Sequence, residues 1–294
     1  MNWDDYRYFL AVARTGQLSQ AGRILGVDHT TVARRTRALE SRLKTKLFDR
    51  SPRGYALTAA GQRLLPVAEQ LERDAERARD SVAGALAPLS GRVRIGVPEG
   101  VGAYVVVRAA QELCEMHGGL RLELVALPRR FSLSRREADF AIAVSPPQSG
   151  RLKVRKIADY KLHLYGARDY LERFPPVRSV EDLKQMRGIA YVPDLIFDKV
   201  LDYIPLIDPA LEPRLTSTSV HVQLQAALNG AGVCILHDFM ARHHERLVRV
   251  LENKISFTRS FWLVVHEDYA DIERIRLSAS HVVKRMREIL KSDG

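Results

Sequence analysis

The segment at residues 30–43 constrains the fold more than any other part of this 294-residue chain, because it reads as a helix with two opposite faces. Apolar side chains recur at helical spacing on one face, and positive side chains occupy the other face and the residue just past the helix. The apolar face carries Val32, Leu39 and Leu43, and the basic face carries Arg34, Arg35, Arg37, Arg42 and Lys44. Such a helix docks on a small core and leaves a positive surface that favours an anionic partner.

Two shorter helices are predicted before the basic one. Asp4 is a suitable N-cap for the first, in which Tyr6, Phe9 and Leu10 recur at helical spacing. Residues 19–25 form the second, Gly26 makes a tight turn, and the Asp28 carboxylate can accept from the free amides of the basic helix. A helix, a short glycine-containing turn and another helix make the helix-turn-helix arrangement that binds DNA.

The geometry of that arrangement predicts which side chains contact double-stranded DNA. The start of the second helix usually lies in the major groove, so side chains there are expected to read base edges, whereas later cations contact phosphates. We expect the base edges to be contacted by His29, Thr30, Thr31 and Arg34, the phosphates by Arg35 and Arg37, and the DNA also by Ser19 of the preceding helix. His29 is equally well explained as an ordinary surface residue.

A β-hairpin, or wing, is predicted after the basic helix. Residues 44–50 and 55–58 read as two short extended runs around a Ser-Pro-Arg-Gly turn. Arg53 at the tip is positioned for a minor groove and Arg50 for a phosphate. A salt bridge within the domain is the alternative for Arg50. The charge distribution supports a polyanion partner, because residues 1–58 hold eleven Lys or Arg against five Asp or Glu, a net +6 of the chain's +11. The alternative is a generally basic protein.

The N-terminal sixty residues resemble the LysR-type bacterial transcriptional regulators. The resemblance is carried by Phe9-Leu10-Ala11-Val12-Ala13, Leu25-Gly26-Val27, Leu47-Phe48-Asp49-Arg50 and Leu57-Thr58, together with Gly16, Ala21, Arg35 and Gly54. It implies a winged helix-turn-helix domain at residues 1–58. The start of the basic helix departs from the family, which often has Ser, Gln and a small residue or Pro where this chain has Asp28, His29 and Thr30. The base preference at residue 29 is therefore not transferred.

A long linker helix is predicted over residues 59–86, with Thr58 as its N-cap and Pro66 in its first turns. Apolar residues alternate at three- and four-residue steps in a narrow seam of the coiled-coil type, formed by Leu64, Val67, Leu71, Ala75, Ala78 and Val82. We expect the seam to pack on a second copy, and the resemblance implies the same homodimer. Packing against the chain's own C-terminal part is the alternative. Residues 87–92 read as a hinge.

Strands and helices alternate from residue 93 onward, which predicts an α/β domain. This half resembles the LysR family more weakly, through Arg92-Val93-Arg94-Ile95-Gly96, Arg136-Glu137-Ala138-Asp139 and Asn229-Gly230-Ala231-Gly232-Val233. The resemblance implies an effector domain at 93–294 with two lobes like those of a periplasmic solute-binding protein. We place lobe I at 93–160 and 267–294, lobe II at 161–266, and the two crossings near 158–162 and 265–268.

Such folds bind small ligands at the carboxyl ends of their strands, which identifies a set of candidate effector contacts. Free amides of a helix starting after Pro98 would suit an anion, and Glu99 beside them would cap that helix or bind a hydroxyl or amine of the ligand. Arg129 or Arg130 is a candidate clamp for a carboxylate. The predicted site comprises Pro98, Glu99, Gly100, Val101, Arg129, Arg130, Ser145, Tyr191, Pro193, Ser217, Thr218 and His237. A small organic acid is the expected effector.

These observations together predict a ligand-controlled DNA-binding regulator that contacts RNA polymerase and assembles as a homodimer and then a tetramer. An exported solute-binding protein would leave the basic N-terminus unexplained. An enzyme is disfavoured, because the sequence has no nucleophile elbow or phosphate-binding glycine loop, and the cluster around His243 and His244 lacks a metal-ligand spacing. We expect no cofactor and no metal.

The sequence also predicts a cytoplasmic protein without a membrane segment. Its start is acidic, it has no long apolar run, and its two cysteines, Cys114 and Cys234, are expected to be buried and reduced.

Overall fold

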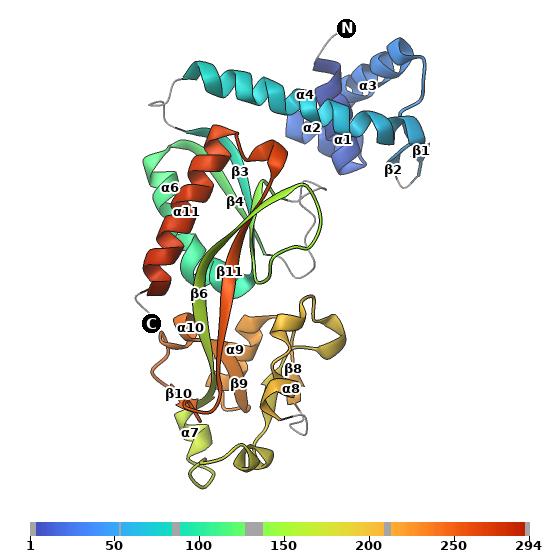
Figure 1. Ribbon diagram of the computed structural model, residues 1–294. Coiled ribbons are helices and arrows are strands. Elements are labelled where there is room, and N and C mark those ends of the chain that lie inside the picture. Colours follow the sequence, from blue (N-terminus) through green and yellow to red (C-terminus); the bar gives the residue numbers. More distant parts are fainter. Residues whose placement is uncertain (1–3, 53, 84–88, 127–137, 209–212, 292–294) are drawn as a thin grey trace. The chain divides into compact units, whose positions relative to one another are not determined.

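The computed structural model describes residues 4–52, 54–83, 89–126, 138–208 and 213–291 (Figure 1). The chain divides into two compact units, Met1–Ala85 and Leu86–Gly294. The first unit includes the long linker helix.

The N-terminal unit contains three helices, a hairpin and the linker helix in the predicted order. Their bounds are α1 Asp4–Thr15, α2 Leu18–Leu25, α3 His29–Leu43, β1 Phe48–Ser51, β2 Gly54–Leu57 and α4 Ala59–Ala83. The core of this unit lies between α1 and α3, where Phe9 of α1 packs with Val32 and Leu39 of α3 and all three side chains are fully buried. Phe48 of the wing joins it, with its ring centroid 5.3 Å from that of Phe9.

The turn before α3 forms as its residues predict. Gly26 ends α2 with a φ of 67°, in the left-handed region that glycine tolerates. The Asp28 carboxylate then accepts a hydrogen bond from the amide of Thr30 at 2.8 Å, so α3 begins at His29, one residue before the predicted start. Gly54 lets the wing approach the end of α1, since a Cβ there would lie 2.4 Å from the carbonyl oxygen of Gly16. These contacts fix α3 and the wing on one small scaffold.

The C-terminal unit consists of two α/β lobes whose strands are hydrogen-bonded into one sheet. The strands are β3 Ser90–Val97, β4 Gly119–Ala126, β5 Phe140–Ala143, β6 Leu152–Ala167, β7 Gly188–Ala190, β8 Pro213–Thr216, β9 Val233–His237, β10 Leu247–Val250 and β11 Ser256–His266. The main helices are α5 Glu99–Val101, which continues through a π-helical turn into α6 Val107–Met116, α7 Arg168–Leu171, α8 Ile204–Ile207, α9 Val220–Leu228, α10 Asp238–Ala241 and α11 Glu273–Lys291. The residues Ser217–Ser219 follow β8 and lead directly into α9.

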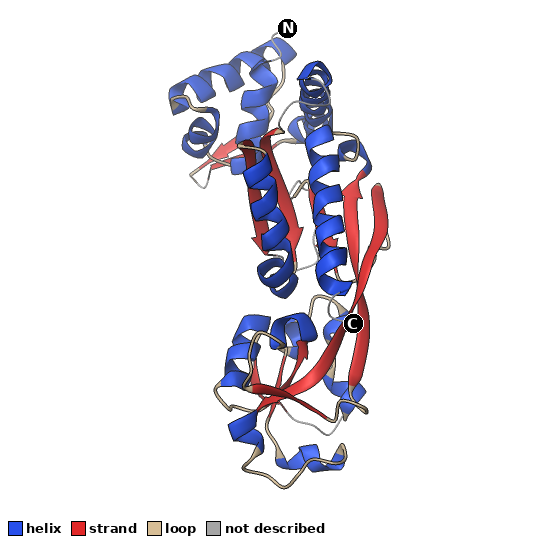
Figure 2. Cartoon of the chain, turned by 90° about the vertical axis from the view of Figure 1, so that its left-hand side faces the viewer, coloured by secondary structure: helices blue, strands red, loops and turns tan. Residues whose placement is uncertain are grey.

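Two long strands join the lobes (Figure 2). The strand order is β4-β3-β5-β11-β6-β9-β7-β8, with β10 also paired to β6. Strand β6 passes between the lobes close to the predicted 158–162. The second crossing lies earlier than the predicted 265–268, because Trp262–Val265 of β11 already pair with β5 in lobe I and a bulge at Phe261/Trp262 marks the change.

Helices α6 and α11 lie side by side in lobe I. Glu112 of α6 accepts hydrogen bonds from His281 and Arg285 of α11, each at 2.9 Å. Cys234 is buried in lobe II, as predicted, but Cys114 is exposed on α6, so the prediction that both thiols are buried is wrong for Cys114. Within the described residues, no helix is long and apolar enough to span a membrane.

Candidate DNA interface and effector site

The first turn of α3 is presented to solvent. His29 and Thr30 are exposed, and Thr31 is half-buried beside them. The carboxylate of Asp28 is fixed by hydrogen bonds from Thr30, which lower its pKa below the usual value. Ser19, at the start of α2, is also exposed. The geometry leaves these predicted DNA contacts accessible.

The arginines of α3 fall into two groups. Arg34 and Arg37 are exposed and make no hydrogen bond or ion pair with another residue of the described ranges. Arg35 instead binds the buried carboxylate of Asp5 at 3.2 Å and lies over the ring of Tyr8. Arg42 pairs with the same carboxylate. A buried carboxylate needs a positive partner, so these two arginines hold α3 against α1, while the exposed pair remains available to an anion.

Arg50 of the wing forms a salt bridge within the domain, which was the alternative to a phosphate contact. Its guanidinium group lies 3.5 Å from the buried carboxylate of Glu40 and over the ring of Tyr55. Glu40 also accepts hydrogen bonds from the amides of Leu47 and Phe48 at 2.9 and 3.3 Å, which ties the wing to α3. Arg50 therefore braces the wing, with 39% of its side chain still exposed. Arg53 lies outside the described residues.

Helix α4 has one buried edge and one exposed apolar edge. Thr58 caps it, with its hydroxyl accepting from the amide of Gly61 at 3.1 Å. Ala68 is fully buried against the N-terminal core, Leu64 packs against that core, and Glu72 pairs with Arg14 at 2.7 Å. The next positions of the predicted seam face outward, since Val67 is 55% exposed and Leu71 38% exposed.

Glu99 joins the two lobes. Its carboxylate accepts a hydrogen bond from the hydroxyl of Ser219 at 2.9 Å and from the amide of Val220 at 3.1 Å, and it lies 3.2 Å from Nδ1 of His221. It therefore caps α9 of lobe II from lobe I. The sequence predicted that Glu99 caps the helix beginning at its own position or binds the ligand, whereas its carboxylate caps a helix that begins 121 positions later.

The predicted anion site at Pro98–Val101 is packed against lobe II. Gly100 and Val101 are buried, and a Cβ on Gly100 would lie 2.8 Å from the sulfur of Met240 and 3.3 Å from a methyl group of Val220. The amide of Gly102 already donates to the carbonyl of Pro98 at 2.9 Å. This close packing makes the start of α5 a contact between lobes, which differs from the open anion site predicted from the sequence.

Other predicted effector residues take several different places. Ser145 of lobe I donates a hydrogen bond to Asp198 of lobe II. Ser217 accepts from the amide of Ser219 at 3.1 Å, and Thr218 is exposed. Arg129 and Arg130 lie outside the described residues.

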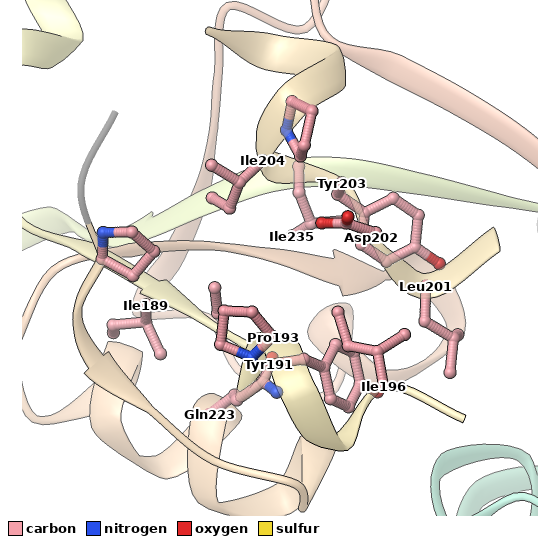
Figure 3. Close-up of a pocket in the computed structure, with 13 residues that line it drawn as sticks. Ile189, Tyr191, Pro193, Ile196, Leu201, Asp202, Tyr203, Ile204, Gln223 and Ile235 are labelled. Atoms are coloured by element: carbon pink, nitrogen blue, oxygen red, sulfur yellow. The ribbon is translucent and has the colours of Figure 1, made fainter. Parts of the chain in front are cut away.

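Tyr191 and Pro193 line a cavity of about 190 Å³ in lobe II (Figure 3). Its wall is mostly aliphatic, with Tyr191, Tyr203, the amide of Gln223 and the exposed carboxylate of Asp202 as its polar features. Burial raises the pKa of both tyrosines, so their hydroxyls stay protonated at neutral pH. A small, mainly apolar ligand fits such a wall. The lining residues come from β7, β9, α9 and the segment of residues 191–213 that follows β7.

His237 is buried beside the junction of the lobes. Its ring packs on those of Tyr160 and Phe239, with centroids 5.4 and 4.9 Å away. Burial lowers the pKa of His237 to about 4, so the imidazole is neutral at physiological pH. Its Nδ1 is buried and has no hydrogen-bond partner in the part of the chain that the structure describes. A buried polar atom of this kind is costly unless something binds it.

Three further buried donors in this unit were missed by the sequence reasoning. The hydroxyls of Tyr160 and Tyr203 and Nε of Arg259 are buried and have no hydrogen-bond partner within the described part of the chain. Arg259 lies opposite Tyr160 in the β6–β11 ladder. One signal was visible, because the alternating run Phe257, Arg259, Phe261 places a cation on an apolar face of β11. In the ranges that the structure describes, no group of three or more His, Cys, Asp or Glu is placed to hold a metal.

Comparisons with known proteins agree with both units. A family model described as "Bacterial regulatory helix-turn-helix protein, lysR family" matches residues 3–62, and one described as "LysR substrate binding domain" matches residues 87–287. The transcriptional activator TtdR of Escherichia coli K12 is 25% identical over 276 residues, covering 90% of this chain and 86% of TtdR.

Solved structures share the fold. A variant of full-length OxyR from Pseudomonas aeruginosa has a TM-score of 0.73 at 16% identity, over 98% of each chain. The Vibrio cholerae virulence activator AphB has a TM-score of 0.56 at 22% identity, over 97% of this chain and 99% of AphB. At these identities the likeness shows the arrangement of helix-turn-helix and two-lobed α/β domains and leaves the ligand to be argued from this chain's residues.

Proposed function

The chain belongs to the LysR family of bacterial transcriptional regulators, and we propose that it binds a specific DNA sequence under the control of a small organic acid held by its C-terminal unit. The observation that supports the DNA role most strongly is the pair of exposed arginines on α3, Arg34 and Arg37, which find no partner among the described residues. They belong to a helix whose first turn is open to solvent. The proposal is a regulator acting on DNA in the cytoplasm, and it includes no catalytic step.

The structure supports separate tasks for the arginines. We assign base-edge contacts to Arg34 with His29, Thr30 and Thr31, and a phosphate contact to Arg37. Arg35 and Arg50 hold α3 and the wing through Asp5 and Glu40, so their first task is to position the reading surface. Ser19 and Arg53 remain proposed DNA contacts from α2 and from the tip of the wing.

Dimerisation through α4 would place two copies of α3 on a dyad-symmetric site. The exposed Val67 and Leu71 continue a stripe that the unit's own core leaves uncovered. A second copy of the same stripe would bury it in a symmetric contact. We further propose that dimers pair into a tetramer, that ligand binding changes the placement of subunits, and that DNA bending and contact with RNA polymerase change with it. A ligand can cause this only by binding one arrangement more tightly than another.

A gel shift at several salt concentrations tests the DNA role. The full chain is first used to select its preferred duplex from a random library. Binding to that duplex should weaken steeply as salt rises from about 50 to 200 mM, by roughly a thousandfold or more if six or more phosphates are neutralised. Binding that is absent at every salt concentration, or that does not depend on salt, would reject the proposal.

The effector role is tested separately on the full chain. A thermal-shift screen of small carboxylates should identify acids that raise the melting temperature, because a ligand that binds only the folded state stabilises it by mass action. The same acid should then alter the footprint or the bend of the selected duplex. An acid that binds tightly and leaves both unchanged would contradict coupling between the units.

A further inference from the structure

Several buried donors of the C-terminal unit are gathered on one face of the crossover strands. Tyr160 of β6 and Arg259 of β11 are opposite each other in an antiparallel ladder, so their side chains share a face. Phe257 and Phe261, two residues to either side of Arg259, lie on that face too, and the ring of Tyr160 stacks on Phe261 with centroids 4.0 Å apart. The cation is therefore framed by aromatic rings.

Tyr203 connects this face to the cavity in lobe II. Its ring lines the cavity and also lies against Phe257, with centroids 5.5 Å apart, while the Arg259 guanidinium lies over the same Phe257 ring at 5.6 Å. The charges of Arg259 and Asp198 both act on the Tyr160 and Tyr203 hydroxyls. Through Tyr203 and Phe257, the cavity is therefore connected to a cluster that holds a cation and two hydroxyl donors.

Only part of the Arg259 guanidinium is engaged by the protein, because its Nη1 donates to the carbonyl oxygen of Thr258 at 3.1 Å. The Tyr160 and Tyr203 hydroxyls and Nε of Arg259 are buried without a hydrogen-bond partner in the described ranges. The nearby carboxylate of Asp198 is engaged elsewhere, because it accepts hydrogen bonds from Ser145 and from the amide of Val200. Buried donors are normally paired, so three of them around Tyr203, which lines the cavity, are suited to an acceptor that carries negative charge.

The lining of the cavity indicates the chemical character of the rest of the ligand. Aliphatic and proline side chains form most of the wall, among them Ile189, Ile196 and Ile204 (Figure 3). The volume of about 190 Å³ is smaller than the roughly 300–1,000 Å³ of pockets for drug-sized ligands, so the bound body is small. The carboxylate of Asp202 in the wall would repel a second negative charge, which favours a ligand with a single acid group.

We propose that this junction binds a small apolar monocarboxylate, with its hydrocarbon body in the lobe II cavity and its carboxylate bound by Arg259, Tyr160 and Tyr203. The inference rests on the proposed effector role and narrows it to one ligand class. It also moves the acid away from the start of α5, where the sequence predicted it, to the crossover strands. Because β6 and β11 join the lobes, a carboxylate held there would contact both of the strands that connect them.

Isothermal titration of the full chain with a homologous series tests the inference. The probes are acetate, butanoate, pentanoate and hexanoate, with hexan-1-ol as the uncharged partner of hexanoate. Affinity should rise about fourfold for each added methylene until the cavity is filled. Hexanoate should bind about tenfold more tightly than hexan-1-ol, or better, because only the acid forms charge-assisted hydrogen bonds.

Variants identify the site. Arg259→Gln should weaken hexanoate binding by roughly tenfold or more and leave hexan-1-ol binding little changed. Tyr203→Phe keeps the aromatic ring in the cavity wall and removes the hydroxyl, so it should lower the affinity for hexanoate by a few fold. Arg246→Gln is the matched control, because this lobe II arginine pairs with Asp169 at the surface and should have no effect. If Arg259→Gln does not fold, Tyr203→Phe and the acid–alcohol comparison still decide.

The proposal fails if affinity does not depend on chain length, if acid and alcohol bind equally, or if Arg259→Gln and Tyr203→Phe, both folded, bind hexanoate like the native chain. It also fails if no member of the series binds. The same preparations are assayed for duplex binding by gel shift. DNA binding that persists when no acid binds would reject this ligand class alone, whereas loss of DNA binding from the native chain would reject the regulator itself.

Discussion

The N-terminal unit carries available cations at its surface, whereas the C-terminal unit carries available donors in its interior. Arg34 and Arg37 project into solvent from α3. Tyr160, Tyr203 and Arg259 present buried atoms at the junction of two lobes. Exposed cations are screened by salt and suit a long polyanion, while buried donors suit one small ligand that replaces the water they have lost. The contrast assigns macromolecular recognition to one unit and small-molecule recognition to the other.

The largest expected effect comes from the exposed stripe of α4. Charge introduced by the double substitution Val67→Glu and Leu71→Glu should prevent dimerisation and weaken binding to the selected duplex by on the order of 100-fold or more, since two linked reading surfaces are lost. Sedimentation velocity and gel shift measure the two effects. Gln62→Glu, an exposed change in the same helix, is the control. A dimer that survives the double substitution would place the subunit contact elsewhere.

The interior of the C-terminal unit should be sensitive to acid. The pKa of His237 is about 4 in the folded state against an ordinary value of 6.5, so the unfolded state takes up a proton first as the pH falls. The stability that this histidine contributes is complete above about pH 6.5 and is lost between about pH 6.5 and 4, by roughly 3 kcal/mol.

Hydrogen exchange of the β9 amides across that range measures the loss. His237→Phe should flatten the pH dependence, and His29→Gln, which removes an exposed histidine from the N-terminal unit, should not. An unchanged pH profile in His237→Phe would show that another buried group is responsible.

Single arginine substitutions sharpen the contrast within α3. Arg34→Ala should cost about 1–3 kcal/mol on the preferred duplex and relax the sequence preference, whereas Arg37→Ala should weaken all duplexes alike and reduce the salt slope by about one. Arg35→Ala should instead lower the stability of the N-terminal unit, because Asp5 loses a partner while remaining fully buried. Competition binding at several salt concentrations and thermal unfolding separate the three outcomes. If Arg37→Ala lost sequence specificity and Arg34→Ala kept it, Arg37 would be the residue that contacts base edges and Arg34 the one that contacts phosphate.

The smallest expected effect is at Glu99. Glu99→Gln removes the charge that caps α9 across the lobes and should cost about 1 kcal/mol, because the hydrogen bonds to Ser219 and Val220 become weaker. Exchange of the first amides of α9 should become faster by a few fold. Glu172→Gln, an exposed change in lobe II, should leave them unchanged. Unaltered exchange in Glu99→Gln would mean that the contact does not hold the lobes together.

The two units also differ in how well the sequence predicted them. The proposed reading surface lies within one short segment, so periodicity, Gly26 and the Asp28 cap were enough to place His29 and Arg34 on an exposed helix. Arg35 was harder, because its partner Asp5 lies thirty residues earlier and only tertiary packing brings the two together.

The proposed effector site of the C-terminal unit combines residues from distant segments, and the sequence named only some of them. Tyr191 and Pro193 do line a cavity, but Arg259 and Tyr160 become neighbours through a ladder between strands about one hundred residues apart. Helix caps were predicted as local contacts, whereas Glu99 caps a helix of the other lobe. The register of β6 with β11 decides which side chains meet, and no short-range pattern encodes it.

The most direct test compares the salt dependence of duplex binding by the native chain with that of the double variant Arg34→Ala, Arg37→Ala. The native chain should show a steep linear fall of log affinity with log salt concentration, and the double variant should show a shallower slope and no preference for the selected sequence. Hexanoate should remain bound to both with equal affinity. Equal slopes and equal preference in the two proteins would contradict the assignment of DNA recognition to the exposed cations of α3.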